Sequence, residues 1–556
     1  MTTFPLIRYS PKPVTLSPHV LTTGPHVLIK YCGDKDTSNL KVDEDNRTDS
    51  RVDKAADSQP MMNNGKAKMV HERVQAENVD VTILGTELTF RNGRKAKNRF
   101  LKAALSEKLS TWDDQDPSKR GIPTQELINI YDKWGNGGYG VILTGNIAVD
   151  PCNLESAGNA IICKENVSPQ SKERFYKMAK VSKNDGALII AQLSHAGRQT
   201  PLAVNEHPYS CSDIQLVSKV VTSGKPVPLE LDQIKTEVID RFVFAAKFAF
   251  DAGFDGVEIH AAHGFLLSQF LSPSTNKRND KYGGSLENRA RIIVEIYEAI
   301  RNFSPVALSA FPCNQSIDRQ KSPDEVVLWW KDEALDFKIK EIPATKGFVI
   351  GVKINSVELQ KDGLTVEESA VVCSMMEKNG FDFVELSGGT FSRPALYHER
   401  ETTRKREAYF IEFAEKIRPV FKNTVLYLTG GFRTAAAMVD AIKCGATNGI
   451  GLGRPTTAEP DLPLKILKQN CMSVANTKVN QDDFFMTLLV CTAQMGQMAK
   501  RPTSELRNVC DGIADLSRVE EAENFKKLVA DYVREIGKLN EQRKPVYGVF
   551  RYTNLF

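Results

Sequence analysis

The sequence lacks the cysteine patterns that mark disulfide frameworks and metal clusters. Its ten cysteines are scattered singly, with no CxxC pair and no four-cysteine group at metal-ligand spacing. Free thiols in a reducing compartment are therefore expected rather than disulfides, and an iron–sulfur cluster is disfavoured.

An excess of one charge is also missing, since 73 Lys and Arg residues face 69 Asp and Glu residues. Such a balance argues against nucleic acid or an anionic membrane as the partner. No apolar run approaches the roughly 20 residues needed to cross a bilayer, and the first residues lack the basic-then-apolar order of a secretory signal. The chain is expected to be cytoplasmic.

The sequence has no G-x-G-x-x-G between a strand and a helix. The stretch "GNGGYG", residues 135–140, precedes a predicted strand instead. A Rossmann nicotinamide domain is therefore excluded, and any bound cofactor must be held by the main fold.

Three parts of the chain differ in composition. Residues 1–77 are largely polar with little apolar periodicity, which predicts a disordered extension. Residues 78–465 alternate short apolar runs with amphipathic segments, and residues 466–556 are expected to form helices that pack beside this part. Residues 302–339 delay the fifth strand by almost forty residues and are interpreted as an insertion or an artefact of the gene model.

Eight near-continuously apolar runs predict strands buried on both faces. They cover residues 99–105, 140–146, 187–195, 256–262, 347–355, 381–389, 425–431 and 448–455. Strand followed by helix, repeated eight times, predicts an α/β (β/α)8 TIM barrel. Polar or glycine residues follow most of these runs, so a site at the C-terminal face is favoured over ordinary turn chemistry.

The last two runs end in glycine-rich loops, "TGGFRTAAAM" and "GLGRPTTAEPDL". Loops after the seventh and eighth strands of barrels commonly bind phosphate through backbone N–H groups. Gly430, Gly431, Gly453 and Arg454 are therefore candidate phosphate ligands, with Arg454 neutralising the charge.

Two histidines, His260 and His263, lie at the end of the fourth run. A metal site would need a third ligand, which no H-E-x-x-H pattern or neighbouring acidic residue supplies, and purely structural histidines are a second alternative. The favoured interpretation is a pair of neutral donors that hold a substrate oxygen and stabilise negative charge on it.

The stretch "EIHAAHGFLLSQFLSPSTNKRNDKYGGSLENRARIIVEI" resembles the old yellow enzyme family of NAD(P)H:flavin oxidoreductases. The motifs "NRFLKAALSE", "VILTGNIAVDP", "AQLSHAGRQT", "GVKINS", "ELSGGT", "LTGGFR" and "GLGRP" follow in that family's order. The resemblance implies an FMN-binding barrel that takes hydride from NADH or NADPH and delivers it to an activated alkene, a small-molecule electron acceptor.

The resemblance also implies roles for single residues. Ala103, Ala104 and Ser106 would lie along one side of the flavin, with Ser106 near its N5 atom, and Gly145 and Asn146 would lie beside the ring. Gln192 would bond the pyrimidine edge, and Lys353 would stabilise negative charge on the reduced flavin.

Many relatives place a proton-donating tyrosine two residues after the second donor, where this chain has Phe265.

The motifs and the resemblance together predict an FMN-dependent oxidoreductase acting on an activated alkene, quinone or nitro acceptor. Two alternatives stay open: a flavin-binding barrel that no longer turns over, and a flavin-free, phosphate-binding lyase or isomerase. The sequence leaves the oligomeric state open.

Overall fold

Eight parallel strands close into a ring in the computed structural model, which describes residues 71–218, 222–302, 347–390 and 410–555. The strands pair in the order β3, β4, β6, β9, β10, β11, β12, β13, and β13 pairs again with β3. Their bounds are Phe100–Lys102, Val141–Leu143, Leu188–Ser194, Gly256–Ala261, Val349–Asn355, Phe383–Ser387, Val425–Thr429 and Gly449–Leu452. Each strand lies within one of the eight apolar runs, so the predicted (β/α)8 barrel is confirmed.

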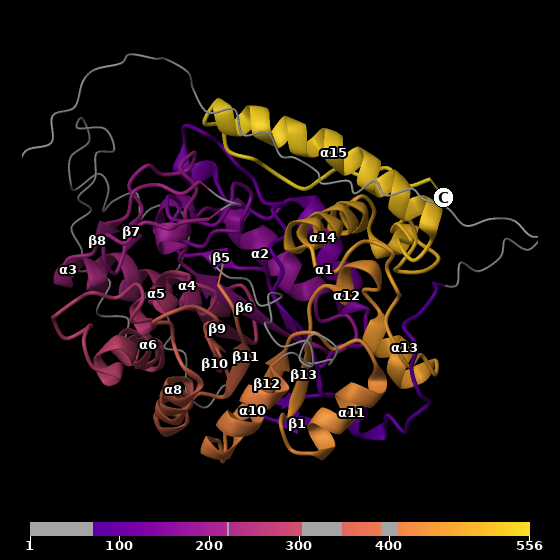
Figure 1. Cartoon of the computed structure of the whole chain (residues 1–556), viewed down its shortest axis with the longest axis horizontal. Coiled ribbons are helices and arrows are strands. Elements are labelled where there is room, and N and C mark those ends of the chain that lie inside the picture. Colours follow the sequence, from indigo (N-terminus) through magenta and orange to yellow (C-terminus); the bar gives the residue numbers. More distant parts are fainter. Residues whose placement is uncertain (1–70, 219–221, 303–346, 391–409, 556) are drawn as a thin grey trace, which may run out of the picture. The chain divides into compact units, whose positions relative to one another are not determined.

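Helices between the strands cover the outside of this ring (Figure 1). They are α1 (Gln125–Gly135), α2 (Pro169–Val181), α4 (Asp240–Asp251), α5 (Leu266–Leu271), α6 (Leu286–Arg301), α8 (Val366–Asn379), α10 (Ile411–Ile417) and α11 (Ala435–Lys443). Two short helices, α12 (Pro455–Ala458) and α13 (Leu462–Lys468), follow the last strand.

Local sequence sets the ends of these helices. In α8 the Thr365 side chain accepts a hydrogen bond from the Glu368 N–H, and the Glu368 side chain accepts one from the Thr365 N–H. The helix ends at Gly380, which adopts φ 92°, a left-handed conformation that glycine takes without steric cost. Such caps satisfy the backbone groups that have no partner at helix ends.

A two-stranded hairpin, β1 (Leu88–Thr89) and β2 (Lys95–Ala96), packs against inward-facing side chains of the barrel. Phe90 beside this hairpin contacts Phe383 of β11, with ring centroids 6.0 Å apart. These side chains form one buried apolar cluster with residues of the barrel strands. The polar residues at the C-terminal ends of the strands lie outside this cluster.

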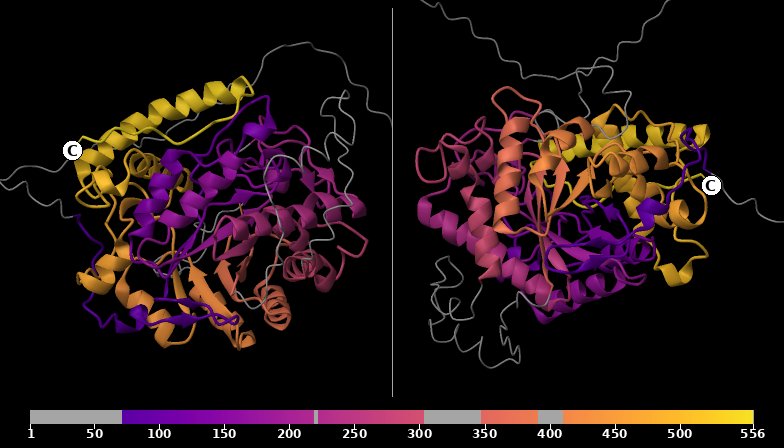
Figure 2. Two further views of the ribbon diagram at one scale, coloured as in Figure 1. Left: turned by 180° about the vertical axis from the view of Figure 1, so that it is seen from behind. Right: turned by 90° about the horizontal axis from the view of Figure 1, so that it is seen from below.

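The chain after the barrel forms two long helices, α14 (Phe484–Ala499) and α15 (Val519–Glu541), which confirms the expected C-terminal helical segment. The two helices share a buried apolar cluster, and α15 is the long yellow helix of Figures 1 and 2. The Asn129 amide of α1 donates to the Ala499 carbonyl at 2.8 Å, which ties α14 to the barrel.

Residues 1–70 of the predicted disordered extension lie outside the described residues, as do 303–339 of the predicted insertion. The last part of the extension, residues 71–77, is described. There Val74 donates its N–H to the Val474 carbonyl, and Asn476 donates to the Glu72 carbonyl. Composition does not reveal this pairing because backbone groups make it. No helix of the described residues is long and apolar enough to cross a membrane.

Candidate active site

The C-terminal ends of the barrel strands open into a cavity of about 430 Å³. All but one of the predicted site residues line it. They are Ala103, Ala104, Ser106, Asn146, Gln192, His260, His263, Lys353, Gly430, Gly431, Gly453 and Arg454. The barrel thus brings together residues that are spread over 350 positions of the sequence, because all eight strands end on this face.

Gly145 is the predicted residue that does not line the cavity. Its N–H donates to the Glu107 carboxylate and to the Tyr131 hydroxyl, both at 2.9 Å. A Cβ atom at this position would lie 1.9 Å from a Glu107 oxygen, so the close approach of Glu107 requires glycine. The structure places Gly145 against this carboxylate, behind the cavity wall.

The glycine loops after β12 and β13 form one end of the cavity. Gly430 and Gly431 have φ of 140° and 83°, backbone values that residues other than glycine rarely adopt. Arg454 is adjacent, and its Nη1 atom is buried without a hydrogen-bond partner among the described residues. A buried guanidinium nitrogen without a partner needs an acceptor, and the phosphate of FMN would supply one.

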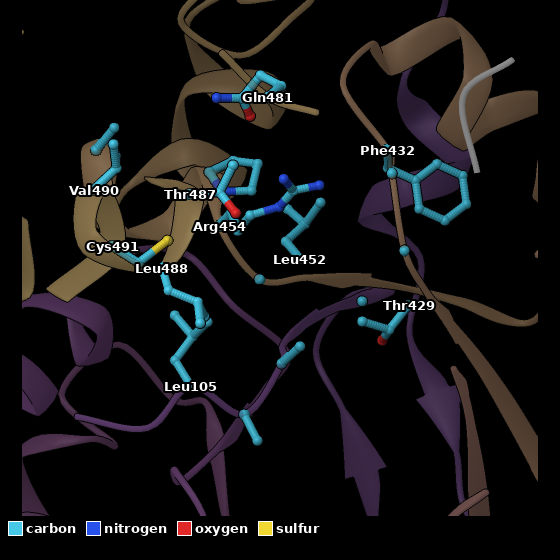
Figure 3. Close-up of a pocket in the computed structure, with 18 of the residues that line it drawn as sticks. Leu105, Thr429, Phe432, Leu452, Arg454, Gln481, Thr487, Leu488, Val490 and Cys491 are labelled. Atoms are coloured by element: carbon cyan, nitrogen blue, oxygen red, sulfur yellow. The ribbon is translucent and has the colours of Figure 1, made fainter. Parts of the chain in front are cut away.

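The C-terminal segment completes this end of the cavity, which the sequence did not predict. In Figure 3, Thr487, Leu488 and Cys491 of α14 lie on one side of Arg454, and Thr429 and Phe432 lie on the other. The amphipathic pattern of α14 indicates a helix, but it carries no signal for which part of the barrel the helix covers.

The floor of the cavity carries buried charge. Lys353 of β10 donates to Glu385 of β11 at 3.0 Å, and Gln192 of β6 donates to Glu258 of β9 at 2.7 Å. One oxygen of each carboxyl group is buried without a partner among the described residues. Burial, and secondly the charge of Glu385, raises the pKa of Glu258 well above its usual range.

The alternation of side chains along a strand indicates from the sequence which way these two carboxyl groups face. Glu258 lies two residues before His260, and Glu385 lies two residues before Ser387, so each faces the same side of its strand as a cavity residue. Glutamate at an inward position of a buried parallel strand needs a partner, which here is a side chain of the cavity floor.

The ring of His260 has a defined tautomer. Its Nδ1 accepts a hydrogen bond from the Ala262 N–H at 3.3 Å, so in the neutral ring Nε2 carries the proton. No described residue bonds this Nε2. The ring therefore offers one N–H donor to the cavity.

His263 is held in a left-handed conformation, φ 60°, which is rare for a residue with a side chain. The Gln199 amide donates to its carbonyl at 2.7 Å, and its N–H donates to Asn355 at 3.2 Å. Its Nε2 is 2.9 Å from the Ser387 hydroxyl. If Ser387 donates in this contact, the neutral ring carries its proton on Nδ1, which provides a second donor.

Both rings stay neutral near physiological pH. Burial, together with the charge of Lys353, lowers the pKa of His263 to about 3. Burial, repulsion from His263 when that ring is protonated, and the charge of Lys353 lower the pKa of His260 well below its usual range. The two rings lie 5.3 Å apart between centroids at an angle of 89°. Acceptor binding through these rings should not change between pH 5 and pH 8.

Protein stability should depend on pH because of the same shift. A histidine whose pKa is lowered in the folded state binds fewer protons there than in the unfolded chain. Its contribution to the free energy of unfolding is therefore fully present above pH 6.5 and is lost as pH falls toward the folded-state pKa. For His263, with a pKa of about 3, the loss at pH 5 should be about 2 kcal/mol. Urea unfolding at pH 7 and pH 5 measures it. His263→Asn should show a smaller loss than the unmodified protein, whereas His207→Asn, at an exposed position, should show the same loss.

Phe265 packs against the first histidine, with its ring centroid 4.6 Å from that of His260. Its ring has no proton to give.

The metal alternative for the histidine pair needs a third ligand, and the described residues contain no group of three His, Cys, Asp or Glu side chains arranged to hold a metal.

Comparisons with known proteins agree with this geometry. Residues 88–306 match the NADH:flavin oxidoreductase / NADH oxidase family. The chain is 37% identical over 429 residues to the NADH-dependent flavin oxidoreductase nadA of Aspergillus parasiticus, covering 76% of this chain and 87% of that protein. It is 28% identical to an NADH oxidase of Thermoanaerobacter brockii, covering 66% of this chain and 48% of that one.

Solved structures share the fold. An old yellow enzyme homologue from Zymomonas mobilis superposes with a TM-score of 0.52 at 22% identity, covering 70% of this chain and 94% of that chain. Morphinone reductase gives a TM-score of 0.51 at 20% identity, covering 71% and 91%. The chain belongs to the NADH:flavin oxidoreductase / NADH oxidase family, the old yellow enzyme family. It is an oxidoreductase that uses FMN with a reduced nicotinamide nucleotide as electron donor.

Proposed function

We propose that this oxidoreductase passes hydride from a reduced nicotinamide nucleotide, by way of FMN, to an activated alkene, quinone or nitro compound. The observation that carries the proposal is a pair of neutral imidazoles, His260 and His263, in the same cavity as Lys353 and Arg454. Bound FMN supplies the group that accepts and then gives up hydride.

The described residues suit the polar groups of FMN. Gly430, Gly431, Gly453 and Arg454 would hold its phosphate, through backbone N–H groups and through the buried Nη1 of Arg454. Gln192 and Lys353 would contact the polar edge of the ring, each fixed from below by a buried glutamate. The positive charge of Lys353 is placed to stabilise negative charge on that edge.

The two histidines would hold the oxygen of the acceptor. Nε2–H of His260 and, with Ser387 donating to His263, Nδ1–H of His263 would donate to a carbonyl or nitro oxygen, which gains negative charge as hydride reaches the conjugated carbon. The neutral state suits the two rings to hydrogen-bond the oxygen of the acceptor, because a neutral ring offers a donor without needing a counter-ion.

Anaerobic reduction of the purified holoenzyme tests the proposal. NADH should bleach the flavin, and an enone, a nitro compound or a quinone should then restore its colour much faster than buffer alone. If the flavin is reduced but no member of such a panel reoxidises it, the chain is a flavoprotein with a different acceptor class, and the proposal is wrong.

The missing tyrosine gives a further prediction about acceptor preference. Reduction of an alkene needs a proton at the carbon next to the one that receives hydride, and Phe265 cannot provide it. Quinones need no carbon protonation, so they should be reduced better relative to enones. Phe265→Tyr should raise enone turnover on the order of 10²-fold, the low end of general-acid contributions, and leave quinone turnover nearly unchanged.

A matched control adds the same hydroxyl elsewhere in the cavity. Phe432→Tyr changes a second lining phenylalanine, and it should leave the ratio of enone to quinone turnover unaltered. An unchanged ratio in the Phe265→Tyr protein with full FMN content would show that the proton comes from another group.

A further inference from the structure

Glu155 is a cavity residue that the sequence did not single out, and two predicted site residues hold it. The Ser106 hydroxyl donates to its Oε2 at 2.6 Å, and the Asn146 amide donates to the same oxygen at 2.8 Å. All three side chains line the cavity. Ser106 follows β3, and both Asn146 and Glu155 follow β4, so two neighbouring strands of the barrel bring the three side chains together.

The orientation of Asn146 is fixed from behind. The Asn159 amide donates to Asn146 Oδ1 at 3.0 Å, and the Ser156 N–H donates to Asn159 Oδ1 at 2.7 Å. This chain of bonds directs the NH₂ group of Asn146 toward Glu155. The carboxylate therefore has a set position in the cavity wall and does not need to be ordered when a ligand binds.

The second oxygen of the carboxylate is open. No described residue donates a hydrogen bond to Glu155 Oε1, and no lysine or arginine of the described residues forms an ion pair with Glu155. Lys353, which lines the same cavity, bonds Glu385, and neither Arg433 nor Arg454 of the lining forms an ion pair with Glu155. The cavity wall therefore presents a carboxyl group with one open oxygen and no cationic partner among the described residues.

We propose that Glu155 is a specificity residue of the acceptor site, and that it binds a cationic or N–H-donating nitrogen on the substrate. The preferred acceptor is then a conjugated carbonyl compound with a protonated amine, its oxygen on the histidines and its nitrogen on Glu155. The lining side chains of Phe265, Phe410 and Phe432 add aromatic rings, which also favour a cation in the cavity.

The substrate class rests on the proposed function, because the carbonyl group is assigned to His260 and His263. The open oxygen of Glu155 does not depend on that assignment. An experiment on ligand binding to the oxidised holoenzyme separates the two, since it requires neither NADH nor hydride transfer.

The ligands are a matched pair, the ammonium compound (aminomethyl)acetophenone and its neutral isostere ethylacetophenone, each as meta and para isomers. Binding is followed by the change in the FMN absorbance spectrum. The unmodified protein should bind the better ammonium isomer at least about tenfold more tightly than its neutral isostere, as expected for a charge-assisted hydrogen bond.

Glu155→Gln removes the charge and keeps an amide oxygen that accepts from Ser106 and Asn146. It should abolish the preference for the cation while affinity for the neutral ketone changes little. Glu173→Gln removes the same charge from an exposed position on α2, where Glu173 pairs with Lys177, and should keep the preference. The assignment is overturned if the unmodified protein shows no preference, if Glu155→Gln retains it, or if neither ketone binds. Failure of every acceptor in the reoxidation panel would overturn the proposed function instead.

Discussion

Replacing Arg454 by alanine is expected to yield a folded protein that has lost most of its FMN. The guanidinium Nη1 is buried without a partner among the described residues, so a phosphate oxygen is the acceptor that the site lacks. Removing one partner of a buried, hydrogen-bonded charge pair costs about 2–5 kcal/mol, which corresponds to a weakening of FMN binding of roughly 30-fold to several thousandfold. Flavin content after dialysis and fluorescence titration of the apoprotein measure the change.

Arg454→Lys provides the matched control. Lysine keeps the positive charge but loses the planar fork of donors, so its FMN affinity should fall between those of the alanine variant and the unmodified protein. Arg91→Ala removes a positive charge from an exposed position and should leave FMN content unchanged. If Arg454→Ala binds FMN as tightly as the unmodified protein, the phosphate lies elsewhere.

Replacing both His260 and His263 by alanine should slow reoxidation by an enone on the order of 10² to 10³-fold, the usual cost of removing a donor from an oxyanion site. FMN content should change little, because neither ring is among the groups that are assigned to the phosphate. Stopped-flow measurements separate reduction by NADH from reoxidation by the acceptor.

Ser387→Ala tests the second donor on its own. Without the hydroxyl, His263 is free to carry its proton on Nε2, so enone reoxidation should slow by less than in the double variant while reduction by NADH stays the same. An equal slowing of both half-reactions in the double variant would indicate a general disturbance of the cavity, and it would contradict the donor role.

The barrel and most of its lining residues were predictable because the signals are local. A strand buried on both faces is a continuous apolar run, and the residue that ends it must lie at the mouth of the barrel. Gly145 shows the limit of this reasoning. It directly precedes Asn146 in the sequence, and because successive residues of an extended chain face opposite sides, Gly145 lies against Glu107 while Asn146 faces the cavity.

The contributions of Glu155 and of α14 were not predictable for a different reason. Glu155 lies in a loop whose path depends on Asn146 and Asn159, and nothing in its neighbours along the chain marks it. Thr487 and Leu488 reach the cavity only because α14 docks on α1, far away in the sequence. Such contacts depend on how whole elements pack, which residue periodicity does not encode.

The wall that α14 forms over Arg454 links cofactor binding to the folding of the chain. During synthesis the barrel strands are complete before α14 exists, so the phosphate end is finished only when the last hundred residues have been made and docked. A ligand that binds only the docked arrangement stabilises it by mass action. Bound FMN should therefore stabilise the docked arrangement of the C-terminal segment. Amide hydrogen exchange in α14 should be faster in the apoprotein than in the holoenzyme.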